Sequence, residues 1–153
     1  MNPIFRNGNM KKLLRRPAAN PFPGIIGTFM GRDALAAAVS ILDLGPDDEV
    51  LLPAYLCKEV LRPFLGRTRV EFYDVKPDLS VDPETIKQKF AKSRIKIMLM
   101  INYFGFLQPY RKELKELCTE NGVILIEDCA HSPLTVGSGV AYHILCQRQE
   151  RGT

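Results

Sequence analysis

The stretch from Val123 to His131, Val-Ile-Leu-Ile-Glu-Asp-Cys-Ala-His, places the tightest limit on what this chain can fold into. Four consecutive apolar residues are typical of a strand buried on both faces, as in parallel sheets. The run ends in Glu127 and Asp128, and ligands of open α/β sheets bind at the carboxyl ends of strands. A poorly hydrated acid there suits a cationic partner such as a protonated ring nitrogen. Asp128 is therefore the first functional candidate, against the alternative that both acids only end the strand and face water.

Length and composition predict one globular domain. The 153 residues are 46% hydrophobic and 25% charged, and no apolar run approaches the roughly 20 residues of a membrane helix. Much of the net charge of +4 comes from the first sixteen residues, which lack interleaved aromatics, so we expect no nucleic-acid partner. Because these basic residues precede Pro-Ala-Ala-Asn-Pro-Phe-Pro and no apolar segment, we expect no secretory signal and a cytoplasmic location.

Four cysteines occur at long and irregular spacings: Cys57, Cys118, Cys129 and Cys146. This spacing favours reduced, mostly buried thiols over a disulfide framework. A zinc site is the alternative, because two of these thiols lie close in sequence to the imidazoles of His131 and His143. The spacings in Cys129-Ala-His131 and His143-Ile-Leu-Cys146 match no common zinc motif, so we expect no metal.

Segments with strand-like and helix-like patterns alternate along most of the chain. Residues 1–30 show no periodicity and are predicted to form an N-terminal arm. A further helix is predicted to begin at Asp82-Pro83-Glu84, with Asp82 as its N-cap. The other predicted helices cover 33–44, 58–65 and 109–120, and the strands cover 49–53, 70–75, 95–101 and 123–126. This alternation with short loops predicts an α/β fold, a three-layer α-β-α sandwich around a mostly parallel sheet.

The start of the first predicted helix, Gly31-Arg32-Asp33-Ala34, is a candidate anion site. Its free N–H groups attract anions, Gly31 permits close backbone approach, and Arg32 adds a charged fork. Asp33 is expected to be a helix-start acid, since its charge would repel a bound phosphate. Helix starts and strand carboxyl ends share one edge of such a sheet, so a phosphate and a protonated ring nitrogen would meet there. Pyridoxal phosphate has both groups, and an aspartate that keeps its ring protonated makes the ring an electron sink.

Four segments of the chain resemble the DegT/DnrJ/StrS-type sugar aminotransferases. Gly-Arg-Asp-Ala-Leu is similar to their phosphate cup, Asp-Asp-Glu-Val-Leu-Leu-Pro-Ala-Tyr to their Gly-Asp-Glu-Val-Ile-Val-Pro-Ser-Phe, Asn-Tyr-Phe-Gly to their His-Leu-Tyr-Gly, and Ile-Glu-Asp-Cys-Ala-His to their Ile-Glu-Asp-Ala-Ala-Gln/His. These segments lie at 31–35, 47–55, 102–105 and 126–131, in order, within a resemblance that spans roughly residues 27–135.

The resemblance implies part of the large domain of a fold type I aminotransferase, with pyridoxal phosphate as cofactor. It also implies transfer of an amino group from a donor such as glutamate to a keto-sugar nucleotide, in a homodimer. By position, Gly31 and Arg32 would hold the cofactor phosphate and Asp128 would pair with the pyridine nitrogen. His131 would lie near the ring hydroxyl.

Two departures from the family pattern affect the expected chemistry. Cys57 occupies the position where the family stacks an aromatic side chain on the cofactor, so either the ring is sandwiched differently or Tyr55 takes that role. Family members also carry a Schiff-base lysine some tens of residues after the aspartate motif, whereas the last lysine here is Lys115.

These departures lead to an expectation for the whole chain. Residues 31–135 would form a partial aminotransferase domain and residues 136–153 a divergent or disordered tail. The chain would then be a truncated or frameshifted product that is inactive alone, because the covalent step needs that lysine. Two alternatives stay open: a noncatalytic α/β protein that binds a phosphorylated ligand or a partner, and a remnant that does not fold stably because it exposes sheet edges.

Overall fold

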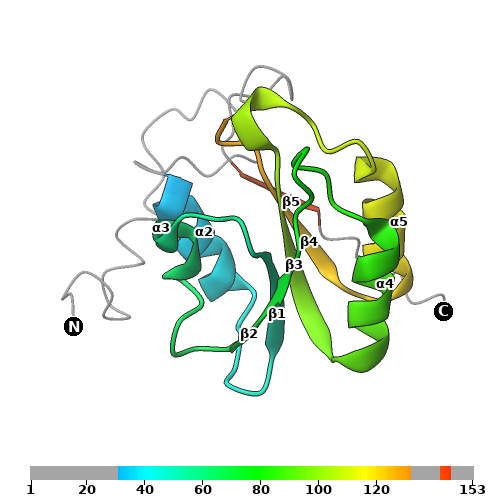
Figure 1. Cartoon of the computed structure of the whole chain (residues 1–153). Helices are drawn as coiled ribbons and strands as arrows, with labels where there is room; N and C mark the ends of the chain where they lie inside the picture. The colour runs from blue at the N-terminus through cyan, green and yellow to red at the C-terminus, as the bar shows by residue number, and fades with distance from the viewer. Residues whose placement is uncertain (1–30, 132–141, 146–153) are drawn as a thin grey trace, which may run out of the picture.

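The computed structural model describes residues 31–131 and 142–145, which contain one sheet with helices on both of its faces (Figure 1). The strand order is β2-β1-β3-β4-β5. Neighbours among the first four strands are parallel, and β5 pairs antiparallel with β4. The strands are β1 (Glu49–Pro53), β2 (Arg69–Tyr73), β3 (Ile95–Ile101), β4 (Ile124–Asp128) and β5 (Tyr142–Leu145). The helices are α2 (Gly31–Ile41), α3 (Lys58–Leu61), α4 (Pro83–Lys92), α5 (Arg111–Glu120) and the 3-10 helix η2 (Tyr103–Gly105).

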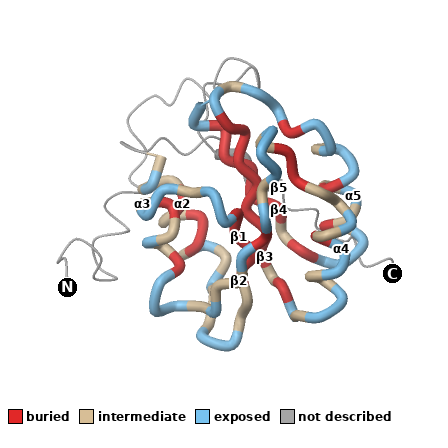
Figure 2. The backbone as a smooth tube through the Cα atoms, viewed as in Figure 1, coloured by how far each residue is buried: buried red, intermediate tan, exposed pale blue. Residues whose placement is uncertain are grey.

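The helices form two layers with the sheet between them, which confirms the predicted three-layer α/β sandwich (Figure 1). Helices α2 and α3 cover one face, and their apolar side chains pack in one core cluster. Helices α4 and α5 cover the other face and contribute to a second cluster. Figure 2 shows that the buried positions concentrate along the central strands.

The position of β3 between the two core clusters explains why its sequence is almost entirely hydrophobic. Ile97, Leu99 and Ile101 belong to the cluster under α2 and α3, whereas Met98 and Met100 belong to the cluster under α4 and α5. Successive side chains of a strand point to opposite faces, so a strand covered on both faces is apolar at nearly every position. The exception is Lys96 near the start of β3, which pairs with Asp48 at 2.9 Å.

Several elements begin or end at other residues than the sequence pattern predicts. Helix α2 begins at Gly31 and ends at Ile41, before Asp43, which has a left-handed φ of 48°. The helix predicted over 58–65 is only the short α3, followed by turns. Strand β4 continues through both acids to Asp128, where the prediction ended it two residues earlier. By contrast, the N-cap of α4 is as predicted, because Asp82 Oδ1 accepts a hydrogen bond from the Glu84 N–H at 3.1 Å.

The predicted tail contains one described element. Residues 142–145, which lie within the predicted tail of 136–153, form β5 and pair with β4. The rest of the tail and the predicted arm over 1–30 lie outside the described residues. Among the helices that the structure describes, none has the length and apolar content needed to cross a membrane.

The cysteines that the structure describes are unpaired thiols. Cys118 and Cys129 are buried, but Cys57 is exposed, so the expectation of mostly buried thiols is wrong for Cys57. Burial raises the pKa of the Cys118 thiol to about 12. Cys146 lies outside the described residues, and no group of three His, Cys, Asp or Glu side chains within 31–131 and 142–145 is arranged to hold a metal ion.

Candidate functional site

The carboxyl ends of β3 and β4 lie side by side at one end of the sheet. Ile101 pairs with Asp128, and Asn102, the residue that follows β3, donates its backbone N–H to the Asp128 carbonyl at 3.0 Å. Helix η2 follows directly after β3 at this end, and α2 also begins there (Figure 1). The fold therefore brings the start of α2 and the end of β4 to one edge, as parallel α/β topology requires.

Asp128 is buried at the end of β4, with 5% of its surface exposed. Its Oδ1 accepts a hydrogen bond from the Ala130 N–H at 2.9 Å. In a strand, residues two apart share a face, so Asp128 lies on the same face as Ile126, which packs in the cluster under α2 and α3. The alternative that Asp128 only ends the strand and faces water is therefore wrong.

Tyr103 and Tyr55 contact each other near the carboxyl ends of β1 and β3. The Tyr103 hydroxyl donates a hydrogen bond to the Tyr55 carbonyl at 2.6 Å, and the two ring centroids are 5.4 Å apart. Burial is the main cause that raises the pKa of Tyr103, and the charges of Tyr55 and Asp128 add to it. Tyr55 is thus connected to Asp128 through Tyr103. Cys57 lies two residues further along, exposed, at the N-cap of α3.

The candidate phosphate residues lie in the first turn of α2. Gly31 is the first residue of this helix, and Arg32 extends toward α3, where its Nη1 lies 3.3 Å from Glu59 Oε2. Arg62 contacts the same carboxylate at 3.0 Å, and its hydrogen bond is the main cause that lowers the pKa of Glu59. Because the Arg32 and Glu59 side chains are both partly exposed, this ion pair is weak and leaves Arg32 able to turn to another anion.

His131 is exposed and lies against η2. Its Nδ1 accepts a hydrogen bond from the Phe104 N–H at 3.3 Å, and the two rings stack with centroids 5.8 Å apart. An Nδ1 that accepts leaves the neutral imidazole with its proton on Nε2. Phe104 has a left-handed φ of 52°, and Gly105 after it has a φ of 92°, so the backbone bends sharply around the imidazole. The structure thus fixes which ring nitrogen of His131 can donate.

The role of Glu127 was not predicted from the sequence. This carboxylate is fully buried and accepts two hydrogen bonds from the Arg111 guanidinium, from Nε at 2.6 Å and from Nη2 at 2.8 Å. These bonds raise the pKa of Arg111. The signal was present in the sequence, because adjacent strand residues point to opposite faces. A buried Glu127 next to Asp128 must therefore find a cation on the face covered by α5, and Arg111 lies in the first turn of that helix.

Asn102 is the second residue whose role was not predicted from the sequence. It is fully buried, and its Nδ2 donates to Glu127 Oε1 at 2.8 Å and to Cys129 Sγ at 3.3 Å. Its Oδ1 accepts the N–H of Gln108 at 3.0 Å. An amide that follows a buried strand directly is the sequence signal for such a bridge. Asn102 therefore joins the ends of β3 and β4 through both its side chain and its backbone.

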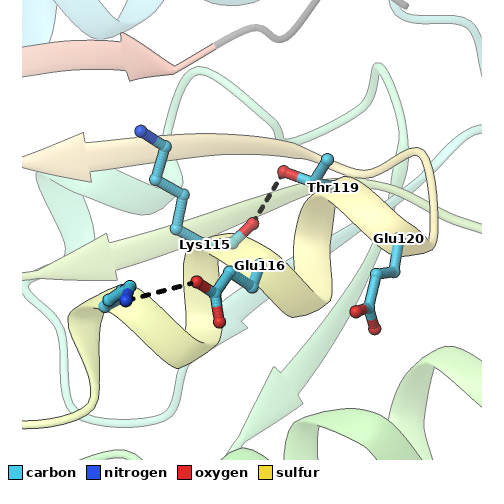
Figure 3. A pocket seen from close by; sticks show the side chains of 5 residues that line it. Lys115, Glu116, Thr119 and Glu120 are labelled. Atoms are coloured by element: carbon cyan, nitrogen blue, oxygen red, sulfur yellow. Dashed lines mark hydrogen bonds and ion pairs between the residues drawn. The ribbon is translucent and has the colours of Figure 1, made fainter.

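A shallow pocket lies on the surface of α5, away from these strand ends. It is lined by Lys112, Lys115, Glu116, Thr119 and Glu120, and Figure 3 shows Lys115 and Glu116 on successive positions of the helix. Helix α5 covers the sheet face opposite to the one on which Asp128 lies. Lys115, the last lysine of the chain, is therefore separated from Asp128 by the sheet.

The model of the DegT/DnrJ/EryC1/StrS aminotransferase family matches residues 24–147. This match reaches beyond the segment of roughly 27–135 over which the motifs resemble the family, and it includes β5. The expectation that the resemblance ends at 135 is therefore wrong. GDP-perosamine synthase of Vibrio cholerae is 30% identical to the chain over 112 residues, which are 71% of this chain and 30% of that protein.

Solved structures agree with this match. The aminotransferase TlmJ from Streptoalloteichus hindustanus superposes with a TM-score of 0.61 at 30% identity, over 67% of this chain and 28% of that one. NtdA from Bacillus subtilis, solved with its cofactor PMP, gives a TM-score of 0.60 over 71% of this chain and 26% of that one; at 22% identity this likeness shows the fold alone. The chain thus spans between about a quarter and 30% of these proteins. Pyridoxal phosphate, of which PMP is the amino form, is the cofactor of the family.

Proposed function

Because the chain belongs to the DegT/DnrJ/EryC1/StrS aminotransferase family, we propose that it supplies the cofactor-binding edge of a pyridoxal-phosphate enzyme that transfers an amino group to a sugar. The observation that carries this proposal is the position of Asp128. The carboxylate is buried at the carboxyl end of β4, on the sheet face that α2 covers, and α2 begins at the same end of the sheet.

Asp128 is proposed to pair with the pyridine nitrogen of the cofactor. When bound, pyridoxal phosphate supplies an electron sink for the carbanion of an amino acid, and a protonated ring nitrogen strengthens that sink. A carboxylate with little exposure to water attracts the N–H cation more strongly than one in bulk solvent does. The hydrogen bond from the Ala130 N–H to Oδ1 limits how far this carboxylate can rotate.

The start of α2 is proposed to hold the cofactor phosphate. The unpaired N–H groups of the first helical turn and the helix dipole favour a dianion there. Arg32 would turn from Glu59 to the phosphate, and the loss of this partly exposed pair costs little. Glu59 keeps its contact with Arg62, so its charge stays paired.

His131 and the two tyrosines are proposed to surround the ring. With its proton on Nε2, His131 can donate a hydrogen bond to the ring hydroxyl oxygen. Tyr55 offers the flat aromatic face that Cys57 lacks, and it contacts Tyr103, the second residue after β3. Tyr55 is therefore the stronger candidate for stacking, although Cys57 occupies the corresponding family position.

We propose that these 153 residues hold the cofactor without a covalent bond and do not transfer amino groups by themselves. No lysine of the sequence follows Asp128, and Lys115 lies on α5 beyond the opposite face of the sheet. An aminotransferase uses an amine close to the cofactor as nucleophile and base.

The substrate is proposed to be a keto-sugar nucleotide, with an amino donor such as glutamate. The support for this class is the likeness to GDP-perosamine synthase. A homodimer in the cytoplasm, without nucleic acid or membrane as partner, belongs to the same proposal.

Cofactor retention tests the proposal directly. The purified chain is mixed with pyridoxal phosphate and passed through a gel-filtration column, and the absorbance of the cofactor is followed in the protein peak. Borohydride reduction and mass analysis then show whether any lysine carries the cofactor. We expect retention without covalent labelling of a defined lysine.

Two variants make the retention test specific. Asp128→Asn should lose the cofactor, and Asp74→Asn, which changes an exposed acid just after β2, should retain it. Equal retention by both variants, or labelling of one lysine in the wild type, would contradict the proposed site. A chain that never retains cofactor would favour a noncatalytic role.

A further inference from the structure

Glu127 and Asp128 are two adjacent buried acids whose side chains lie on opposite faces of the sheet. Glu127 is fully buried on the α5 side, and Asp128 is 5% exposed on the α2 side. They share one peptide unit, so any rotation of the strand end that displaces one carboxylate displaces the other. A group that holds Glu127 therefore also determines where Asp128 lies.

Glu127 is held by a planar, two-bond contact. Arg111 donates through Nε at 2.6 Å and through Nη2 at 2.8 Å, which fixes both the distance and the plane of the carboxylate. The Arg111 side chain is 37% exposed, but its partner carboxylate is fully buried, so removing Arg111 leaves a buried charge without its main cation. The raised pKa of Arg111 agrees with a strong contact.

Asn102 transmits this contact to the neighbouring acid. Its side chain donates to Glu127 Oε1 at 2.8 Å, while its backbone N–H donates to the Asp128 carbonyl at 3.0 Å. Asn102 thus binds the carboxylate of Glu127 through its side chain and the main chain of Asp128 through its backbone N–H. The Asn102 side chain is fixed in turn by the Gln108 N–H.

We propose that Arg111 is a positioning residue for Asp128, acting through Glu127 and Asn102 to hold the end of β4. The part of this inference that concerns cofactor binding rests on the proposed function. Arg111 itself lies on the α5 side of the sheet and would not contact a cofactor bound at Asp128.

Two amide protons report the position of Asp128 without any cofactor. The Asn102 N–H donates to the Asp128 carbonyl and the Ala130 N–H donates to its Oδ1. The Ala54 N–H, which donates to the Tyr73 carbonyl at the end of β1, serves as internal reference. Hydrogen exchange of these three amides is measured by NMR on the isotope-labelled full chain, because exchange rates follow local opening.

Arg111→Met removes the cation and Arg111→Lys keeps the charge but loses the fork. Arg62→Met is the matched control, since it breaks an exposed pair with Glu59. We expect Arg111→Met to raise exchange at Asn102 and Ala130 about tenfold relative to Ala54, with a smaller rise of at least about threefold in Arg111→Lys. Arg62→Met should leave the ratio unchanged.

The inference would be overturned if the exchange rates at Asn102 and Ala130, relative to Ala54, stayed within about twofold of the wild type in the Arg111 variants. A uniform rise of the exchange rate at all three amides would also overturn it, because that result indicates a structural role only. If Arg111→Met does not fold, the same criterion applied to Arg111→Lys decides.

The effect of Arg111 on cofactor binding is tested with pyridoxal phosphate labelled with ¹⁵N at the ring nitrogen. If the wild type binds it, Arg111→Met should weaken binding about tenfold and shift the ring nitrogen signal toward the unprotonated form. If Arg111→Met left the cofactor affinity and the ring nitrogen signal unchanged, the proposed effect of Arg111 on cofactor binding would be overturned. A wild type that does not bind the cofactor would contradict the proposed function, whereas the exchange ratio would still decide the positioning role.

Discussion

Replacement of Gly105 by Ala tests the turn that holds His131. Gly105 has a φ of 92°, and a Cβ built on it would lie 3.3 Å from the backbone oxygen of His131. The left-handed conformation costs an L residue about 1–2 kcal/mol, and the tight contact with a backbone atom adds to this cost. We therefore expect Gly105→Ala to lower the free energy of unfolding by about 2–3 kcal/mol.

Two other glycines separate the contributions. Gly66 has a φ of 71° with nothing within 4 Å of an added Cβ, so Gly66→Ala should show the conformational cost alone, about 1–2 kcal/mol. Gly45 has no positive φ, and its nearest atom would be Asp48 Oδ2 at 3.8 Å, an ordinary contact. Gly45→Ala should change stability by less than about 1 kcal/mol in either direction.

Urea unfolding followed by circular dichroism measures all three variants. The expected order of destabilisation is Gly105 first, then Gly66, then Gly45. If Gly105→Ala were as stable as Gly66→Ala, the close approach of Gly105 to His131 would be refuted. If it were as stable as Gly45→Ala, the strained turn itself would be refuted.

Three further predictions concern other elements. Asp82→Ala should lower the free energy of unfolding by about 1 kcal/mol, because it removes the N-cap of α4. Asp82→Asn should lower it by less, because Asn can still cap the helix and only the exposed ion pair with Lys76 is lost. Thermal unfolding measures both variants. A thiol reagent mapped by mass spectrometry should modify native Cys57 quickly and Cys118 only on unfolding, and equal rates would contradict the described burial. Burial raises the folded-state pKa of Cys118 to about 12, so the neutral thiol stabilises the fold fully below the unfolded-state pKa of about 9, and this contribution is lost as the pH rises from 9 toward 12. Cys118→Ala should therefore lose less stability than the wild type over this pH range, as measured by denaturant unfolding. An equal loss of unfolding free energy in both proteins would refute this prediction.

The fold was largely predictable because its signals are local. The almost entirely apolar sequence of β3 and the cap of α4 at Asp82 match the structure, since strand periodicity and helix capping depend on neighbouring residues. The end of α2 was less predictable. Leu42 and Leu44 continue the apolar spacing beyond its last residue, Ile41, and the left-handed turn at Asp43 leaves no comparable mark in the sequence.

The candidate site was predictable only in part. The position of Asp128 follows from the length of an apolar strand and the topology of a parallel sheet. The ion-pair partners of Arg32 and Glu127 could not be predicted from the sequence, because Glu59 is 27 residues from Arg32 and Arg111 is 16 residues from Glu127. Such pairs depend on how helices pack against the sheet, which no local pattern specifies. Alternation of the strand faces nevertheless indicates that a buried Glu127 needs a cation on the α5 side.

The central claim is that Asp128 binds the ring nitrogen of pyridoxal phosphate. The most direct measurement is the ¹⁵N chemical shift of the labelled ring nitrogen, recorded with the wild type, Asp128→Asn and the control Asp74→Asn. We expect a protonated ring nitrogen with the wild type and the control, and an unprotonated one with Asp128→Asn at the same cofactor concentration. A ring nitrogen that is equally protonated with Asp128→Asn would contradict the claim.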